Sequence, residues 1–430
     1  MKIEYMHPAD QLVMFMSRIY ERGLTTTSGG NLSIRDENGD IWITPAGIDK
    51  GTLTRSDIIC VKPDGNCVGP HKPSSELPFH ASVYKKRPDL NAVLHAHPPG
   101  LVAFSIVRKL PDLFLIPSVS KACGQIAMAE YALPGSAELG ENIAKEFSDG
   151  TDIVLLENHG VVIGAKDLFE AFMKFETLEY SANLEILANK IGKPRSLTPE
   201  DIAITNTKIH ETMDDFIPHT HAPEEQAARR DMITLIKRSY RQGLFSATHG
   251  TYSVRLSDGS FIITPFGRDR AYLQEEDLVR IKNGMKEQGK TPSRAVKFHE
   301  QVYLNNPGIN AVLLAHPMHV MAFAVTDAKL DPRTIPESYI LLREIAKEPY
   351  ESIFGKPEET SKKFNNRVPA LIFQNDCVVV TGATLLQAFD RLEVAETTAA
   401  SVIASKEVGK IVHITEKEVE DLKTAFHLCD

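Results

Sequence analysis

The sequence has few cysteines, and they lack the spacing of a disulfide framework or of a thiolate metal site. Its 430 residues include five, an odd number without C-x-x-C pairs. They are Cys60, Cys67, Cys123, Cys377 and Cys429. Structural disulfides are rare in reducing compartments, so the sequence predicts free thiols and a cytoplasmic protein.

Long apolar runs and an excess of basic residues are also missing. No apolar run approaches the roughly 20 residues that a membrane helix needs, and residues 1–5 do not begin a signal peptide. The net charge of −9 argues against a nucleic-acid-binding surface, which requires a basic face. We therefore expect no membrane or nucleic-acid partner. The composition, 42% hydrophobic and 24% charged, is typical of a globular chain with two or three domains.

Two histidines stand at the end of a predicted buried strand. Val93-Leu94 leads into His95-Ala96-His97, and Pro98-Pro99 ends the strand. Side chains at i and i+2 point to the same face, so His95 and His97 present two imidazoles side by side. Neutral imidazole is a common metal ligand. The H-x-H pattern alone is weak evidence, because many such pairs are ordinary polar residues.

A third histidine lies on a turn between two apolar strands. His159 occurs in Glu157-Asn158-His159-Gly160, flanked by Leu155-Leu156 and Val161-Val162. A turn of this kind exposes its side chains, and a solvated hairpin is the alternative reading. Catalytic zinc usually has three protein ligands and one open position. With His95 and His97, His159 completes such a set.

Small polar residues precede the histidines in the chain. Ser74, Ser75 and Glu76 stand at the expected start of a helix, where free N–H groups attract phosphate; Glu76 is alternatively a carboxylate that balances the helix dipole. The Gly29-Gly30 pair allows the backbone to approach a ligand closely, and Asn31 adds an amide donor. Thr44-Pro45-Ala46-Gly47 forms a second small-residue loop.

The order of predicted elements indicates a mixed α/β fold with many antiparallel hairpins, unlike regular βαβ alternation. Helices are expected over residues 9–22, 75–86, 137–147 and 167–190. We predict a first domain at 1–192, a proline-rich linker at 193–223 with a short helix after Thr198, and a second domain at 224–430. The linker contains another H-x-H, His219-Thr220-His221, but no strand carries it.

The second half of the chain repeats the first at an offset of about 220 residues. The matching pairs are Ile43–Gly47 with Ile263–Gly267, Leu32–Arg35 with Tyr252–Arg255, and Asn91–Leu94 with Asn310–Leu313. The apolar framework therefore occurs twice. The sequence predicts two copies of one domain.

The polar residues do not repeat. His97 has a counterpart in His316, whereas the other positions change: His95 to Leu314, His159 to Asp376, Glu76 to Ala295 and Asn31 to Thr251. Leucine cannot bind a metal, and one histidine with one aspartate makes a poor zinc site. We therefore expect the first copy to carry the chemistry and the second copy to lack the metal site.

These motifs together resemble the class II aldolase/adducin family, and specifically its fuculose-phosphate aldolase-like members. The resemblance covers residues 9–190 in the first copy and the framework alone over 225–410 in the second. It is carried by Ser28–Ser33, Thr44–Gly47, Ser74–Glu76, His95–Pro98 and Asn158–Gly160. The resemblance implies two tandem three-layer α/β/α domains, each with a mostly antiparallel central sheet.

The resemblance also implies roles for individual residues. His95, His97 and His159 would hold Zn²⁺, or another divalent ion such as Mn²⁺, and Glu76 would move a proton. The substrate phosphate would be bound by Asn31, Thr44, Gly47, Ser74 and Ser75. Family aldolases use a tyrosine from a neighbouring subunit, and Tyr131 and its second-copy counterpart Tyr350 occupy the matching positions; a packing or surface role is the alternative for each.

The implied function is that of a lyase of carbohydrate metabolism. It would cleave or form a C–C bond in a phosphorylated ketose through a metal-stabilised enediolate. A 4-epimerase, a dehydratase and a decarboxylase are alternatives on the same scaffold. A non-enzymatic adducin-like interaction module is an alternative of another class, against which the intact Glu76 and three histidines argue. The family implies a four-fold homo-oligomer, and our hypothesis is that two copies of this chain form a pseudo-four-fold ring of domains or that two rings stack.

Overall fold

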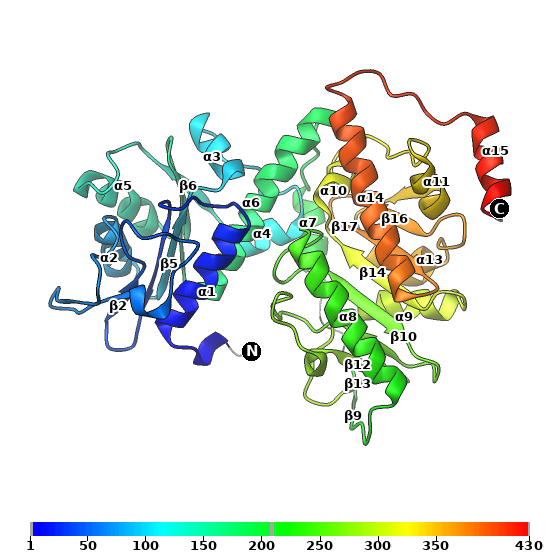
Figure 1. Ribbon diagram of the computed structural model, residues 1–430, viewed down its shortest axis with the longest axis horizontal. Coiled ribbons are helices and arrows are strands. Elements are labelled where there is room, and N and C mark those ends of the chain that lie inside the picture. Colours follow the sequence, from blue (N-terminus) through cyan, green and yellow to red (C-terminus); the bar gives the residue numbers. More distant parts are fainter. Residues whose placement is uncertain (1–2, 207–209, 211, 429–430) are drawn as a thin grey trace. The chain divides into compact units, whose positions relative to one another are not determined.

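The computed structural model describes residues 3–206, 210 and 212–428, so Cys429 lies outside the described residues. The chain forms two compact units (Figure 1). The first domain comprises Lys2–Leu113 and Ser118–Asn183, and the second comprises Phe114–Pro117 and Leu184–Asp430. The division thus falls inside one long helix, α6 (Leu168–Ile191).

The first domain is built on an eight-stranded sheet of order β4-β3-β2-β1-β5-β8-β7-β6. Its strands are β1 (Asn31–Arg35), β2 (Ile41–Ile43), β3 (Ile59–Val61), β4 (Cys67–Val68), β5 (Ala92–Ala96), β6 (Ile126–Ala129), β7 (Ile153–Leu156) and β8 (Gly160–Ala165). Only the β6–β7 pair among these is parallel. The prediction of a mostly antiparallel sheet is confirmed.

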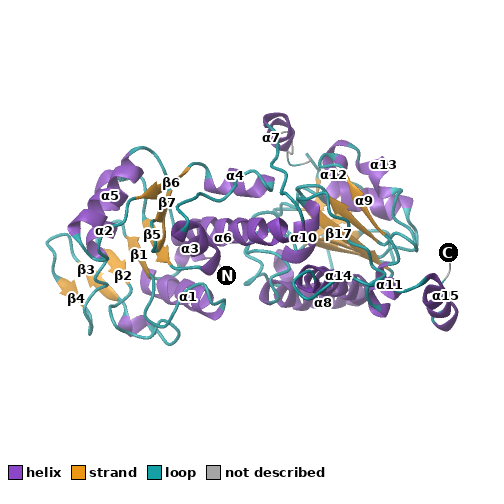
Figure 2. Ribbon diagram, turned by 90° about the horizontal axis from the view of Figure 1, so that it is seen from above, coloured by secondary structure: helices purple, strands orange, loops and turns teal. Residues whose placement is uncertain are grey.

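Helices cover both faces of this sheet (Figure 2). They are α1 (Pro8–Glu21), α2 (Leu77–Lys86), α3 (Pro99–Ile106), α4 (Pro117–Cys123), α5 (Ala137–Ser148) and α6. In Figure 2, α2 and α5 lie on one face, and α1, α3 and α6 lie on the other. All five residues of β5 are buried, because this central strand is covered on both sides. The layers confirm the predicted α/β/α sandwich.

The second domain repeats this topology. Its sheet has the order β15-β16-β17-β14-β10-β11-β12-β13-β9, which is the first-domain order with one added strand. The strands are β9 (Asp215–Phe216), β10 (Thr251–Arg255), β11 (Phe261–Ile263), β12 (Val279–Lys282), β13 (Met285–Glu287), β14 (Ala311–Ala315), β15 (Ile345–Glu348), β16 (Ala370–Phe373) and β17 (Cys377–Gly382). Its helices are α7 (Pro199–Asn206), α8 (Pro223–Arg241), α9 (Val296–Asn305), α10 (Met318–Ala324), α11 (Pro336–Leu342), α12 (Ser352–Gly355), α13 (Pro357–Ser361), α14 (Leu385–Ser405) and α15 (Glu416–Ala425).

The region predicted to be a linker contributes to the second sheet. The short helix expected after Thr198 is α7, and β9 pairs in parallel with β13. His221 lies beyond β9 and its Nδ1 is 2.8 Å from Glu225, an ordinary side-chain hydrogen bond. Part of the 193–223 segment is therefore folded structure.

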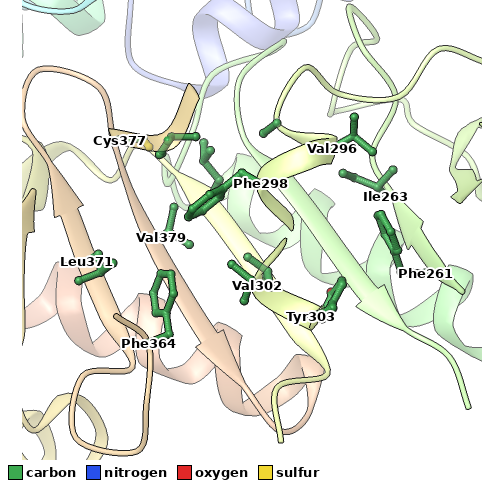
Figure 3. Close-up of a cluster of buried hydrophobic side chains, with 14 of the residues drawn as sticks. Phe261, Ile263, Val296, Phe298, Val302, Tyr303, Phe364, Leu371, Cys377 and Val379 are labelled. Carbon is green, nitrogen blue, oxygen red and sulfur yellow. The ribbon is translucent and has the colours of Figure 1, made fainter. Parts of the chain in front are cut away.

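The second core packs α9 against its sheet (Figure 3). Phe298 of α9 lies against Val379 of β17, and Val302 lies further along the same helix. The retained apolar pattern noted in the sequence corresponds to this core. Among the described residues, no helix combines the length and the apolar character needed to cross a bilayer.

Candidate metal and proton-transfer site

His95 lies in the middle of the first sheet. It belongs to β5 and pairs with Asn31 of β1 on one side and with Val162 of β8 on the other. Its Nδ1 is 3.0 Å from the carbonyl oxygen of Val161, to which it donates, so the lone pair of Nε2 faces the site. A backbone carbonyl on the second ring nitrogen is the usual way of orienting a metal-ligating histidine.

His97 is seated between two glycines. A Cβ on Gly29 would come within 2.9 Å of His97 Nδ1, and a Cβ on Gly160 would come within 2.7 Å of His97 Cδ2 and 2.5 Å of the Ala96 oxygen. Both positions therefore require glycine to leave room for the imidazole. The close approach that the Gly29-Gly30 pair predicts is thus an approach to a side chain of the protein itself.

The turn between β7 and β8 carries His159. Asn158 adopts φ of 54°, a left-handed conformation that asparagine tolerates, and the His159 N–H donates to the Leu156 oxygen at 3.1 Å. The ring of His159 lies 4.9 Å from that of His95 and 5.0 Å from that of His97, measured between centroids. The structure brings together the three histidines that the sequence singled out.

The three histidines are suited to a divalent cation. Their ligand nitrogens lie within 4.8 Å of one another, and the Nε2 atoms of His95 and His97 are 3.0 Å apart. Burial, together with repulsion from the neighbouring histidines, lowers the pKa of both His95 and His97 to about 3. Burial likewise lowers the pKa of His159. The rings are therefore neutral at physiological pH, the form that binds a metal.

Glu76 faces this cluster. Its Oε2 lies 3.4 Å from His95 Nε2, and its Oε1 lies 3.8 Å from His159 Nε2. Oε1 is buried and has no hydrogen-bond partner among the described residues. A bound cation or a substrate hydroxyl would satisfy such an oxygen. The three imidazole nitrogens and the unpartnered Glu76 Oε1 are therefore suited to a divalent ion such as Zn²⁺.

A chain of buried hydrogen bonds orients Glu76. The Asn31 side-chain nitrogen donates to Glu76 Oε2 at 2.6 Å, and Asn31 Oδ1 lies 2.5 Å from His80 Nε2. His80 Nδ1 in turn lies 2.7 Å from the Ser33 hydroxyl, which is 2.7 Å from the Tyr84 hydroxyl.

One direction of donation satisfies every member of this chain. The Asn31 NH₂ group donates to Glu76, so the Asn31 Oδ1 accepts from the Nε2–H of His80. Neutral His80 then accepts at Nδ1 from the Ser33 hydroxyl, and Ser33 accepts from the Tyr84 hydroxyl. Burial lowers the pKa of His80 well below its ordinary value, which keeps the relay neutral.

The sequence motifs assign no role to His80. The repeat contains the signal that reveals it: Ser33, His80 and Tyr84 have counterparts in Ser253, His299 and Tyr303. The sequence likewise gives no sign that two glycines surround His97, because only the folded sheet brings Gly29, His97 and Gly160 together.

The predicted phosphate-binding residues come from two adjoining loops and β1. An isolated bridge joins Pro45 to Pro73, and the Ser74 N–H donates to the Thr44 oxygen at 3.2 Å. Gly47 has φ of 68°, and Ser75 is exposed. The Thr44 hydroxyl accepts from the Leu32 N–H, so it is engaged within the loop. The loops are thus adjacent, with Asn31 positioned beside Glu76.

The helix that follows these serines begins later than expected. α2 starts at Leu77 and its N-terminal flanking residue is Glu76, whereas the sequence placed the start near Ser75. Ser74 Oγ accepts the Glu76 N–H at 3.3 Å, which makes a turn ahead of the helix. Neither Ser74 nor Ser75 caps α2, because the residue that immediately precedes the helix is Glu76.

The two candidate tyrosines differ in exposure. Tyr131 follows β6, is 56% exposed, and its N–H donates to Glu157 Oε2 on the turn that carries His159. Tyr350 is only 6% exposed within the second domain.

The second copy has lost more than its metal ligands. Besides Leu314 and Asp376, it has His249 in place of Gly29 and Cys377 in place of Gly160. Its histidine pair is His249 and His316, with ring centroids 5.2 Å apart. Among the described residues, three suitable side chains gather for a metal only at His95, His97 and His159.

Comparison with known proteins agrees with this duplicated architecture. The sequence profile of the Class II Aldolase and Adducin N-terminal domain matches twice, over residues 10–186 and 230–403. An L-fuculose phosphate aldolase of Methanococcus maripaludis is 39% identical over 173 residues, which are 40% of this chain and 93% of that protein. A solved structure of an L-fuculose 1-phosphate aldolase is 35% identical, covering 47% of this chain and 95% of its own, with a TM-score of 0.42.

Relatives with other reactions are similar to a comparable degree. A 3-oxo-tetronate 4-phosphate decarboxylase of Pectobacterium atrosepticum is 35% identical over 45% of this chain and 89% of that protein. A 5-deoxy-D-ribulose 1-phosphate aldolase of Bacillus thuringiensis is 32% identical over 45% of this chain and 90% of that protein.

Proposed function

Because the chain belongs to the class II aldolase and adducin family, we propose that its first domain cleaves or forms a C–C bond in a phosphorylated ketose with the help of a divalent metal ion. The observation that carries this proposal is the position of Glu76. Its carboxylate is held by Asn31 on one side and faces the three histidines on the other. A proton-transfer group beside a metal-ligand set is what an aldol cleavage requires.

The residues divide the reaction between them. In the cleavage direction a substrate hydroxyl loses its proton, the adjacent C–C bond breaks to give an aldehyde, and the electron pair passes toward the ketose carbonyl oxygen. A divalent ion on His95, His97 and His159 supplies positive charge to oxygens in this region. Glu76 delivers the proton that the ketose-derived carbon then takes up. Tyr131 is the candidate for the hydroxyl proton, because its exposed side chain is accessible to a substrate, whereas Tyr350 is buried.

Phosphate binding rests on neutral donors. Asn31, Thr44, Gly47, Ser74 and Ser75 remain the proposed binding residues. The adjoining loops and the backbone N–H groups ahead of α2 support this part of the proposal, because such groups bind phosphate without a lysine. Zn²⁺ is the proposed ion, with Mn²⁺ as the alternative, since three neutral imidazoles favour zinc.

Decarboxylation of a phosphorylated 3-oxo acid is the second candidate function. It is favoured by a relative named as such a decarboxylase, which is 35% identical over most of its own length. Both reactions break a bond to a carbon next to a carbonyl and place charge on the same oxygen. A 4-epimerase or a dehydratase remains an alternative on this scaffold, and an adducin-like module without activity would have no use for an oriented Glu76.

One experiment separates these candidates. The full-length chain, loaded with Zn²⁺, is incubated with L-fuculose 1-phosphate, 5-deoxy-D-ribulose 1-phosphate and 3-oxo-tetronate 4-phosphate. Aldehyde release from either ketose phosphate, lost in Glu76→Gln, supports an aldolase. Carbon dioxide release from the oxo acid without aldehyde release would replace it with a decarboxylase. No turnover of any of the three would overturn both. Sedimentation velocity of the same preparation tests the proposed homo-oligomeric ring.

A further inference from the structure

The second domain contains a cavity of about 710 Å³ between the edge strand β15, the helix α11 and the C-terminal helix α15. Its lining residues all belong to this domain. The loop at 329–333 forms another part of the wall, and Figure 1 shows α15 beside α11 at the C-terminal end of the chain. Small-molecule sites commonly have volumes of about 300–1,000 Å³. The cavity is therefore large enough for a ligand.

The wall of this cavity is rich in basic side chains. Six basic and three acidic residues line it. The basic residues are Lys329, Arg333, Arg343, Lys347, Arg367 and Lys423, and the acidic residues are Asp331, Glu344 and Glu416. The whole chain, by contrast, has a net charge of −9. A concave site with an excess of positive charge attracts anions.

The three acids of the wall form ion pairs with two of these cations. Arg333 lies 3.0 Å from Asp331 Oδ2 and 3.0 Å from Glu416 Oε1. Arg367 Nε lies 3.2 Å from Glu344 Oε2. The pair with Glu416 joins the loop at 329–333 to α15. The acids thus offset only part of the positive charge around the cavity.

Lys347 extends from β15 toward the loop that follows α10. Its Nζ donates to the backbone oxygens of Thr326 and Ala328 at 2.8 and 2.7 Å. Burial lowers the pKa of Lys347, Asp327 opposes this shift, and the positive charge of Lys329 adds to it. An anion in the cavity would stabilise the charged form of this amine.

Arg343 has an unusual backbone conformation at the end of α11. Its φ is 52° and its ψ is −71°, a region that residues with a side chain rarely adopt. The first domain has Gly124 at the matching position, with φ of 61°. Arg343 is 9% exposed, and its guanidinium carbon lies 5.3 Å from the centroid of the Tyr339 ring. Strain of this kind persists where the side chain has a use, so a role in ligand binding explains an arginine in place of glycine.

The other basic residues of the sheet and loop are also specific to the second copy. Ile116-Pro117 and Ile335-Pro336 align the two copies here, and β6 and β15 each pair in parallel with the next strand of their sheets. The first domain has Leu110, Phe114, Met128 and Gly150 where the second domain has Lys329, Arg333, Lys347 and Arg367. Apolar residues and glycines in one copy thus correspond to cations around one cavity in the other.

We propose that this cavity binds an organic phosphate that carries two or more negative charges. The arginines present paired donors to phosphate oxygens, and the lysines add positive charge. Ile345 of β15, Ile372 of β16 and Tyr339 of α11 offer apolar contact to the body of the ligand. Inorganic phosphate would fill only a small part of the volume. The binding is separate from the proposed reaction, because it uses residues of the second domain alone.

Isothermal titration calorimetry of the full-length protein with ATP, and separately with fructose 1,6-bisphosphate, tests this proposal at constant ionic strength. At least one of the two probes is expected to bind. Lys347→Met installs the first-domain residue and is expected to weaken that binding about tenfold or more, because a charged donor is lost. Lys410→Met, the same exchange at an exposed position outside the cavity, is expected to leave the affinity unchanged.

A second variant guards against misfolding of Lys347→Met. Arg343→Gly also installs the first-domain residue, and glycine adopts a positive φ without strain. It is expected to weaken binding about tenfold or more and to leave the thermal unfolding temperature equal or higher. A purely structural role for Arg343 would instead lower that temperature and leave the affinity unchanged.

The two probes distinguish the possible bodies of the ligand. Tighter binding of ATP would support an aromatic base against the apolar wall, and tighter binding of the bisphosphate would support a phosphorylated sugar. Binding of neither probe by the wild type would overturn the proposal. Equal affinities of wild type, Lys347→Met and Arg343→Gly would overturn it as well, because the probe would then bind elsewhere. None of these results depends on turnover by the first domain.

Discussion

The side-chain nitrogen of Asn31 lies 2.6 Å from Oε2 of Glu76. This hydrogen bond joins two polar residues that the second domain has exchanged, since it has Thr251 and Ala295 in their places. It also leaves Oε1 as the carboxylate atom that faces His159. The proton-transfer group of the proposed reaction is thus oriented by the sheet, through β1, before any substrate binds.

Replacing Glu76 by glutamine is expected to remove most of the activity. Glutamine has nearly the same shape but cannot take up and release a proton, so kcat should fall by about 10²- to 10⁴-fold. Steady-state assay of the active substrate measures the fall. Metal content and the unfolding temperature serve as controls and should not change. A variant with nearly wild-type kcat would show that another group moves the proton.

Metal content should follow the histidines of the first domain only. Elemental analysis of the wild type is expected to give about one zinc ion per chain. The double variant His95→Ala/His97→Ala should contain none. The matched control is His316→Ala, which removes the counterpart of His97 and should leave the metal content unchanged. Two ions per chain, with one lost in His316→Ala, would place a metal site in the second domain as well.

A methyl group at Gly160 should displace His97. The added Cβ would lie 2.7 Å from the His97 ring and 2.5 Å from the Ala96 oxygen, so something must shift. We expect Gly160→Ala to lose zinc and to destabilise the first domain by about 1–3 kcal/mol. Gly164→Ala is the control, because its Cβ would meet Leu90 and Phe147 at 2.6 and 2.8 Å, away from the histidines. It should destabilise the domain and still retain its zinc.

The two tyrosines should respond differently to loss of their hydroxyl groups. Tyr131→Phe is expected to lower kcat by about 10²-fold if its hydroxyl takes part in proton transfer. Tyr350→Phe should leave kcat unchanged, because its side chain is 6% exposed in its own domain. The pair is compared on one substrate at saturation. A lowered kcat in Tyr350→Phe alone would reverse the assignment and support a role for the second copy in catalysis.

Acid should destabilise the second domain through His299. Its pKa falls from an ordinary 6.5 to about 3 in the folded state because of burial. The unfolded chain therefore binds the proton first, and stability is lost as the pH falls from 6.5 toward 3, by up to about 1.4 kcal/mol per pH unit. Native-state hydrogen exchange of β14 in phosphate-free buffer measures this loss. His299→Gln should show a shallower dependence on pH, and an equal slope would contradict the assignment.

Much of the site could be predicted from local sequence. The H-x-H pair at a strand end and the turn histidine each follow from patterns a few residues long, and the three histidines do meet in the fold. The second copy without metal ligands follows from comparison of the two halves of the chain. The seat of His97 could not be predicted in this way. It depends on Gly29 and Gly160, which are separated by more than a hundred residues and approach each other only through the register of β1, β5 and β8.

The relay behind Asn31 illustrates a different limit. His80 belongs to α2 and stands four residues after Glu76, the residue that precedes this helix, but spacing alone does not show which atom a buried imidazole meets. Comparison of the two copies does supply a signal. Ser33, His80 and Tyr84 repeat although the catalytic positions do not, which indicates a structural requirement common to both domains.

The side chains at His249 and Cys377 make the loss in the second domain hard to undo. Restoring histidine at Leu314 and Asp376 would recreate the ligand types, but His97 needs glycine at positions 29 and 160, and the second domain has His249 and Cys377 at the matching positions. At least four exchanges would have to coincide, and each intermediate would gain nothing from its step. In evolutionary terms the loss of the metal site is effectively irreversible by single substitutions. Selection can therefore act on the second copy only for what it does without the metal.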